Sequence, residues 1–432
     1  MKKNVIRALF VAALGIGALS MSACESDVKA KEYQAGTPVK VGLICLHDNQ
    51  STYDKNFIDA LSVAVGNLGT KIDGDPIVKT GINEDQECYN AAKDLVKQGC
   101  NVIFADSFGH EPFMLKAAQK WPQVQFCHAT GTQALTAGVS NYHNAFASIY
   151  EGRYLAGYAA GLKLASMVLA GELNENNYDA QGNIKLGYIG AFQYAEVISG
   201  YTSWYLGVKS VVDNVVMDVT FTKSWYDFDA EEAGARTLIT RGAALISQHA
   251  DSMGAPGECE KQRVPDVGYN VSTQEACPNT YVAHSKINWA PYYEAVVKAM
   301  YNGTAIAGEV NNNFTGTLDT DSVQYDTSNI ATKTLCEAVK LELKNGTRKV
   351  FDCSTFTVTV DASKGLNTNA TVDANGHLTS YMADVEDRGD YAPDTEAVVT
   401  KDGITYFDES AKRSAPYFDL TIDGITLLNS GF

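Results

Sequence analysis

The chain has 432 residues, a formal net charge of −17 at pH 7 and nine cysteines. This length exceeds one ordinary hydrophobic core, so two or three domains are expected. The apolar fraction of 45% and charged fraction of 20% are typical of a globular protein and exclude a disordered one. The acidic excess argues against a nucleic-acid partner, which would require a basic surface.

The N-terminus has the layout of a secretory signal. A basic segment at residues 2–7 precedes an uncharged, apolar stretch at 8–23, which is shorter than the roughly 20 residues of a membrane span. Met21-Ser22-Ala23-Cys24 resembles a bacterial lipobox, with Met21 where that pattern prefers Leu. We therefore expect residues 1–23 to be a signal peptide, Cys24 to be lipidated, and the polar residues 24–38 to tether the protein to a membrane outside the cytoplasm. An ordinary signal peptide with an incidental cysteine is the alternative.

Strands and helices then alternate along the chain. Hydrophobic periodicity predicts strands at 39–46, 77–80, 101–105 and 124–128, and helices at 56–68, 85–98 and 112–120. The pattern repeats with helices at 151–167, 196–212, 230–241 and 289–301, and strands at 184–190, 215–221, 244–247, 267–270 and 281–284. An irregular loop is expected through Cys259. Such alternation is typical of right-handed crossovers and parallel sheets, so an α/β fold with two doubly wound lobes is expected.

The C-terminal third is less regular. Residues 311–326 are expected to cross between the lobes, 331–344 to form a helix, 350–361 a strand and 367–377 a loop, while 406–410 and 416–425 look ordered. We thus predict a first lobe from 39–150 plus about 285–310 and a second from 151–284 plus about 311–350. Residues 351–432 would be a C-terminal extension packed on the lobes near the hinge.

The remaining eight cysteines leave their pairing open. No two have the CxxC spacing of a zinc or redox site. An exported protein permits disulfides, and Cys259 with Cys277 and Cys336 with Cys353 each bracket one local segment. Buried free thiols are equally compatible with the strand-like surroundings of Cys45 and Cys127.

Four segments together resemble a known family. They are 41–44 with 51–61, 152–160, 185–190 with 207–211, and 267–270 with 284–286. The second includes Tyr154-Leu155-Ala156-Gly157, close to a Tyr-Leu-Ala-Gly helix of the basic membrane protein family of lipoproteins, also called the purine-nucleoside-receptor-A type. The resemblance implies the fold of type I periplasmic binding proteins, two lobes joined by a hinge. It also implies an ABC permease as partner and a nucleoside as ligand.

The resemblance also implies a set of ligand-binding residues at the carboxyl ends of strands, where such sheets bind ligands. Tyr53 stands where the family has its stacking Phe, Asp54 where it has Asn, and Lys286 where it has a Lys beside the second hinge. The full expected set is Asn49, Tyr53, Asp54, Phe108, Thr130, Trp225, Asn270 and Lys286. Thr130 and Asn270 stand where the family has Asp, which leaves a different nucleoside, a free base or a sugar-like polar compound open as ligand.

Other function classes find little support in the sequence. HExxH, GxSxG, Walker A and GxGxxG motifs are absent, so we predict no catalytic activity, no cofactor and no metal site. The acidic clusters lack metal-ligand spacing and are expected to be solvated loops. A nucleoside-processing enzyme and a surface interaction lipoprotein are the alternatives from other classes.

Overall fold

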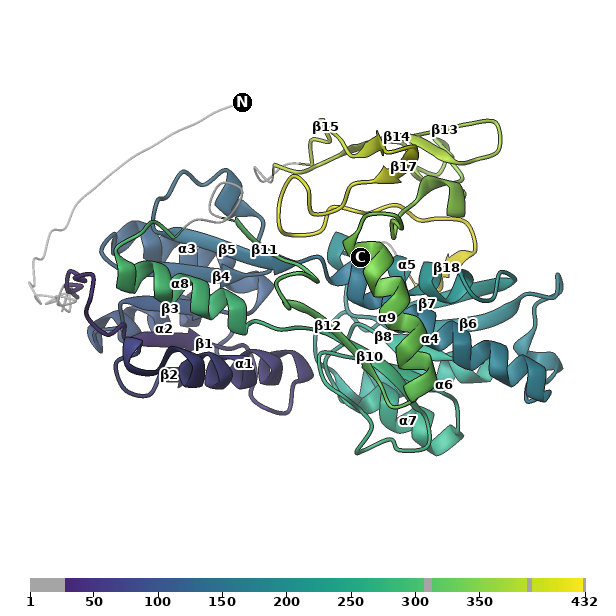
Figure 1. The fold of residues 1–432 in the computed structure, drawn as a ribbon, viewed down its shortest axis with the longest axis horizontal. Helices are drawn as coiled ribbons and strands as arrows, with labels where there is room; N and C mark the ends of the chain where they lie inside the picture. The colour runs from purple at the N-terminus through teal and green to yellow at the C-terminus, as the bar shows by residue number, and fades with distance from the viewer. Residues whose placement is uncertain (1–27, 307–312, 387–390, 430–432) are drawn as a thin grey trace, which may run out of the picture.

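The computed structural model describes residues 28–306, 313–386 and 391–429 and has two α/β lobes side by side, as predicted (Figure 1). The expected signal peptide and Cys24 lie outside the described residues. Within the described ranges, no helix is long and apolar enough to cross a membrane.

The first lobe is built on a six-stranded parallel sheet in the order β11-β5-β4-β3-β1-β2. Its strands are β1 (Val41–Ile44), β2 (Ile77–Lys79), β3 (Val102–Ala105), β4 (Gln125–Ala129), β5 (Tyr142–Ala147) and β11 (Asn313–Gly316). The helices are α1 (Thr52–Leu68), α2 (Gln86–Lys97), α3 (Glu111–Lys120) and α8 (Ala290–Asn302). Alternate residues of β3 join different cores: Phe104 packs with the helices α1 and α8, and Ile103 packs with α2 and α3. Both faces of the sheet are therefore covered.

The second lobe has a seven-stranded sheet in the order β12-β10-β9-β8-β6-β7-β18, in which only β12 runs antiparallel to its neighbour. The strands are β6 (Ile184–Gly190), β7 (Val215–Phe221), β8 (Ile246–Gln248), β9 (Asp266–Tyr269), β10 (Tyr281–Ile287), β12 (Val323–Thr327) and β18 (Ile425–Leu427). The helices are α4 (Ile149–Ala170), α5 (Ala195–Lys209), α6 (Phe228–Thr240), α7 (Gly254–Gln262) and α9 (Ile330–Lys344). Helix α7 replaces the expected irregular loop, because Pro256 lies in its first turn, where proline is tolerated.

The lobe boundaries differ from those expected. Strand β11 pairs with β5, so residues 313–316 belong to the first lobe, and β10 continues to Ile287 in the second. Strand β5 was not predicted, because His143 and Asn144 interrupt its apolar pattern although all six of its residues are buried. The chain therefore crosses between the lobes after β5, β10 and β11.

The C-terminal extension, residues 351–432, adds a small sheet and a hairpin. Its strands are β13 (Ala370–Val372), β14 (Leu378–Ala383), β15 (Thr395–Glu396), β16 (Val398–Lys401) and β17 (Ile404–Phe407). The strand expected at 350–361 is absent from these described residues, because Asp352 accepts from the Ser354 N–H and starts a short 3-10 turn. Strand β13 lies within the expected loop at 367–377.

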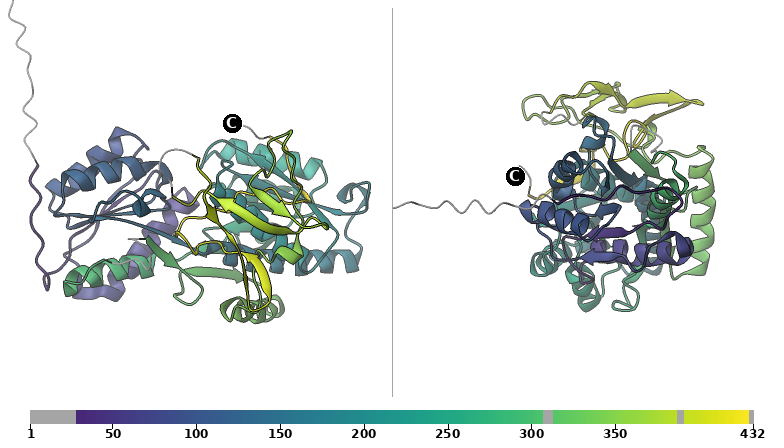
Figure 2. Two further views of the ribbon diagram at one scale, coloured as in Figure 1. Left: turned by 90° about the horizontal axis from the view of Figure 1, so that it is seen from above. Right: turned by 90° about the vertical axis from the view of Figure 1, so that its left-hand side faces the viewer.

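The extension is attached to both lobes. Its last strand, β18, adds to the edge of the second lobe's sheet beside β7. On the other side, the Ser414 hydroxyl donates to Asn313 Oδ1 at 3.0 Å in the first lobe. Figure 2 shows the extension lying over the second lobe and reaching toward the first.

All eight cysteines of the described residues are buried free thiols. The two pairings considered from the sequence are therefore not formed in this structure, and the thiols act as small apolar side chains of the cores.

Helices α4 and α5 approach each other closely at a pair of glycines. A methyl group added at Gly157 would overlap the carbonyl oxygen of Trp204, and one at Gly207 would overlap that of Tyr154. Gly157→Ala should lower the free energy of unfolding by about 1–3 kcal/mol, because the helices must separate. Gly66→Ala in the exposed part of α1, where nothing lies within 4 Å, should raise it by up to about 1 kcal/mol. Urea unfolding of both variants measures the difference, and equal stabilities would contradict the packing described.

Candidate functional site

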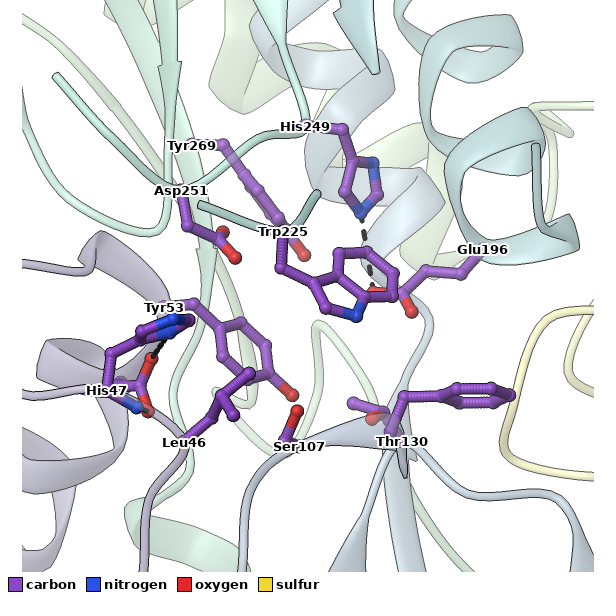
Figure 3. Close-up of a pocket in the computed structure, with 12 residues that line it drawn as sticks. Leu46, His47, Tyr53, Ser107, Thr130, Glu196, Trp225, His249, Asp251 and Tyr269 are labelled. Atoms are coloured by element: carbon purple, nitrogen blue, oxygen red, sulfur yellow. Dashed lines mark hydrogen bonds and ion pairs between the residues drawn. The ribbon is translucent and has the colours of Figure 1, made fainter. Parts of the chain in front are cut away.

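A small cavity lies between the two lobes, at the carboxyl ends of strands from both sheets (Figure 3). The chain leaves β1, β3 and β4 on one side and β7, β8 and β9 on the other, which is where ligands of such sheets bind. The cavity is lined by Leu46, His47, Tyr53, Asp54, Ser107, Phe108, Thr130, Glu196, Trp225, His249, Asp251 and Tyr269.

The lobes are closed over this cavity. The Thr52 N–H of the first lobe donates to the Asp251 carbonyl of the second at 2.9 Å. At the hinge, Asn56 Nδ2 donates to the Ile287 carbonyl at 2.6 Å. The cavity is therefore a closed cleft.

Tyr53 and Asp54 lie on the first turn of helix α1, not on a loop before it. Ser51 is the N-cap, and its hydroxyl accepts from the Asp54 N–H at 3.2 Å, so the helix starts earlier than apolar spacing suggests. The Tyr53 hydroxyl donates to the Asp106 carbonyl at 2.7 Å, which fixes its ring against the cavity (Figure 3). The capping therefore orients both side chains.

Asp54 is ionised in this setting. It is 1% exposed and accepts from the His47 N–H at 2.8 Å. Burial alone would raise the pKa of Asp54, but hydrogen bonds from His47 and Ser51 outweigh it and lower the pKa below its usual range. Burial and then the charge of Asp54 raise the pKa of its neighbour Asp106 well above the usual range. Two carboxyl groups whose pKa values are shifted in opposite directions thus lie beneath the cavity.

Cys45, Asp54 and Asp106 form the one group in the described ranges that could present three metal-ligand atoms, all within 4.8 Å of one another. Asp106 Oδ1 accepts from the Leu46 N–H, and both Asp54 oxygens face His47. Contacts with Leu46 and His47 therefore occupy one Asp106 oxygen and both Asp54 oxygens.

The second lobe contributes an aromatic ring and two further acids. Trp225 lies across the cavity from Tyr53, with Asp251 and Glu196 to its two sides (Figure 3). Burial raises the pKa of Glu196 to about 7. Burial and then the nearby charges of Glu231 and Asp54 raise the pKa of Asp251 well above its usual range. The cavity therefore concentrates carboxyl groups, and each has one long contact with a protein donor: His249 Nε2 lies 3.4 Å from Glu196 Oε1, and Asn270 Nδ2 lies 3.5 Å from Asp251 Oδ1.

A buried arginine supports this wall from behind. Arg153 is 1% exposed, and its guanidinium lies 3.3 Å from the centre of the Tyr269 ring. It donates to the Gln248 carbonyl at 2.7 Å. Its positive charge lowers the pKa values of Glu196 and Asp251 against the larger effect of burial. Arg153 thus partly neutralises the acids of the cavity.

Thr130 and Asn270 share an unusual backbone conformation. Their φ angles are 72° and 66°, in the left-handed region that a β-branched residue such as Thr rarely adopts. Each follows the carboxyl end of a strand that faces the cleft, β4 and β9 respectively. Left-handed residues of this kind often occur at binding sites, where the surrounding structure holds them.

Five of the eight expected ligand-binding residues line the cavity: Tyr53, Asp54, Phe108, Thr130 and Trp225. The structure places the other three outside it. Asn49 is exposed in the turn before Ser51, Lys286 lies on β10 opposite Gln324 of β12, and Asn270 lies behind Asp251 with Nδ2 3.5 Å from Oδ1. Asn270 and Lys286 were expected from their places in a family pattern, which fixes the strand and not the direction of the side chain.

Sequence reasoning missed seven lining residues: Leu46, His47, Ser107, Glu196, His249, Asp251 and Tyr269. Most of them lie at or just after the end of a predicted strand. That position could have identified them as candidates. Asp251 and His249 follow β8, whose end lay beyond the residues expected as strand. Glu196 lies on the first turn of α5 and had no comparable signal.

The geometry agrees with the comparison to known sequences. The profile of the family described as ABC transporter substrate-binding protein, PnrA-like, matches residues 42–348. The chain belongs to this family. The resemblance found in the sequence is thereby confirmed, and the family consists of solute-binding proteins.

Individual relatives agree with this family membership. A purine-binding protein of Brucella abortus is 29% identical over 283 residues, which are 65% of this chain and 71% of the relative. A candidate ABC transporter glucose-binding protein of Haloferax volcanii is 28% identical over 204 residues, so the match spans about half the length of that relative. A solute-binding protein of Aeropyrum pernix shares the fold with a TM-score of 0.57 and 13% identity, over 76% of this chain and 95% of that one.

The ionised state of Asp54 can be tested through stability. Because the pKa of Asp54 is lower in the folded protein than in the unfolded chain, its stabilisation is present above the unfolded pKa and is lost as the pH falls through the folded pKa. Asp54→Asn should cost about 1–3 kcal/mol of unfolding free energy at pH 7. In urea titrations, the difference in unfolding free energy between wild type and Asp54→Asn should shrink as the pH falls through the folded pKa. Asp59→Asn, on the exposed face of the same helix, is the control with little effect; a gap that persists at low pH would contradict the ionised state.

Proposed function

We propose that this protein captures a nucleoside in the cleft between its lobes and delivers it to an ABC importer. The observation that carries the proposal is the pairing of two aromatic rings, Tyr53 and Trp225, from opposite lobes with the buried carboxyl groups of Asp251 and Glu196 (Figure 3). A nucleobase offers two flat faces to the rings. The ribose hydroxyls and base amino groups supply the donors that the carboxyl groups need. The purine-binding relative of Brucella abortus supports this ligand class.

A sugar-like compound or a free base is the second candidate. Sugars also bind between aromatic rings and carboxylates, and the Haloferax relative is a candidate glucose-binding protein. The two chemistries differ in what the rings contact, because a sugar has no planar π-system to stack on them. The residues that line the cavity do not separate the two.

The site predicts how ligand affinity depends on Tyr53. Stacking is worth about 1–3 kcal/mol per base, so Tyr53→Ala should weaken nucleoside binding about 10- to 100-fold in calorimetry. Tyr53→Phe, which keeps the ring and loses its hydroxyl contact with Asp106, should retain most of the affinity.

The calorimetric panel contains purine and pyrimidine nucleosides, their free bases, ribose and glucose. Tightest binding of a nucleoside, recovered chemically unchanged, supports the proposal. Equal nucleoside affinity in wild type and Tyr53→Ala would contradict it. Tightest binding of glucose or ribose would favour the sugar alternative, and formation of free base from nucleoside would favour an enzyme.

The proposal includes anchoring in the cell envelope through a lipid on Cys24, with residues 24–38 as the tether to the folded lobes. Cys24→Ala should release the protein from the membrane fraction, because a thiol is required for the lipid attachment. Fractionation and mass measurement of the mature N-terminus check this. A Cys24→Ala variant that still carries lipid and sediments with membranes would contradict the anchor.

A further inference from the structure

A second, larger cavity adjoins the ligand cavity. It has a volume of about 530 Å³ and shares Phe108, Thr130 and Glu196 with the inner one. The polar side chains of Thr130 and Glu196 thus line both spaces and form a neck between them. A ligand bound between Tyr53 and Trp225 has a route outward past this neck.

The outer cavity has three walls. Phe108 of the first lobe and Tyr194 of the second approach each other with ring centres 5.5 Å apart. The C-terminal extension closes the third side with Tyr391 and Asp419. Tyr194 and Tyr391 are 45% and 64% exposed, which is high for large aromatic side chains with nothing to bind.

The extension holds its side chains at this wall by specific hydrogen bonds. Asp419 accepts from the hydroxyl groups of Tyr381 and Tyr391, the latter at 3.2 Å. The Arg413 guanidinium donates to the carbonyls of Ala415, Val385 and Pro416, at 3.1, 2.9 and 2.8 Å. These bonds fix the segment that faces the cavity.

The charge balance of the outer cavity is acidic. Glu196 and Asp419 line it, and the guanidinium of Arg413 donates to three backbone carbonyls. A phosphate group placed here would face the carboxyl groups of Glu196 and Asp419. Hydroxyl groups or an ammonium group would find acceptors and aromatic faces.

We infer that the outer cavity is a second subsite, continuous with the first, for an uncharged or cationic substituent carried by the nucleoside. This inference rests on the proposed function and deepens it, since it makes the ligand a substituted nucleoside and excludes nucleotides. The extension would then serve to recognise the substituent, which explains why a segment outside the matched residues 42–348 reaches the cleft.

Calorimetry on the full-length mature protein tests the subsite. The probes are the tightest-binding nucleoside of the panel, its 5′-monophosphate, and its derivatives bearing an aminohexyl chain on the 5′ carbon or on the base. We expect at least one aminohexyl derivative to bind tenfold or more tightly than the parent, and the monophosphate to bind more weakly. Tyr391→Ala and Asp419→Asn should remove most of this gain while leaving affinity for the parent within twofold. Asp402→Asn, in the exposed turn between β16 and β17, is the matched control and should change neither.

The outcomes separate the two proposals. If the parent nucleoside binds and neither derivative binds more tightly, the outer subsite is wrong and the proposed function stands. If the monophosphate binds more tightly than the parent nucleoside, the inference that the outer cavity takes an uncharged or cationic substituent is wrong. A gain that survives both Tyr391→Ala and Asp419→Asn overturns the role of the extension. If no nucleoside binds, the proposed function fails and the subsite fails with it.

Discussion

Closing the two lobes removes ionisable side chains from water, and the rest of the site is organised around this desolvation. Asp54 and Asp251 are 1% and 4% exposed, and the raised pKa values of Asp251 and Glu196 reflect the same burial. Buried carboxyl groups are costly unless donors pair with them. Under the proposed function, a ligand that supplies such donors would favour the closed state over the open one and so couple binding to lobe closure.

The fold provides the rigid parts that this coupling needs. The first sheet is covered on both faces, and in the second sheet Tyr188 and Ile189 of β6 likewise pack in different cores, so the strand ends are fixed positions that approach the cleft from either side. The N-cap Ser51 aims Tyr53 and Asp54, and the stacked pair Arg153 and Tyr269 supports the opposite wall. Three chain crossings join the lobes, and the backbone bond between Thr52 and Asp251 bridges them when the cleft is closed.

Much of the fold could be predicted from the sequence, because most strands are short apolar runs bounded by turns. Strands β6 and β7 were predicted with their observed bounds. Strand β5 was missed because its polar residues are satisfied by tertiary contacts, such as the bond from the Gly131 N–H to Asn144, which a local pattern cannot show. The binding site was predicted only in part, again because a local pattern cannot show tertiary contacts. Tyr53 follows a clear strand, whereas Asp251 and Glu196 reach the cavity only through the arrangement of the second lobe.

Small-angle scattering of the purified protein, with and without nucleoside, measures whether a ligand that bridges Tyr53 and Trp225 holds the cleft closed. We expect the radius of gyration to fall at saturating nucleoside and to approach the value of the closed structure. An unchanged radius in a sample shown by calorimetry to be saturated would contradict this expectation.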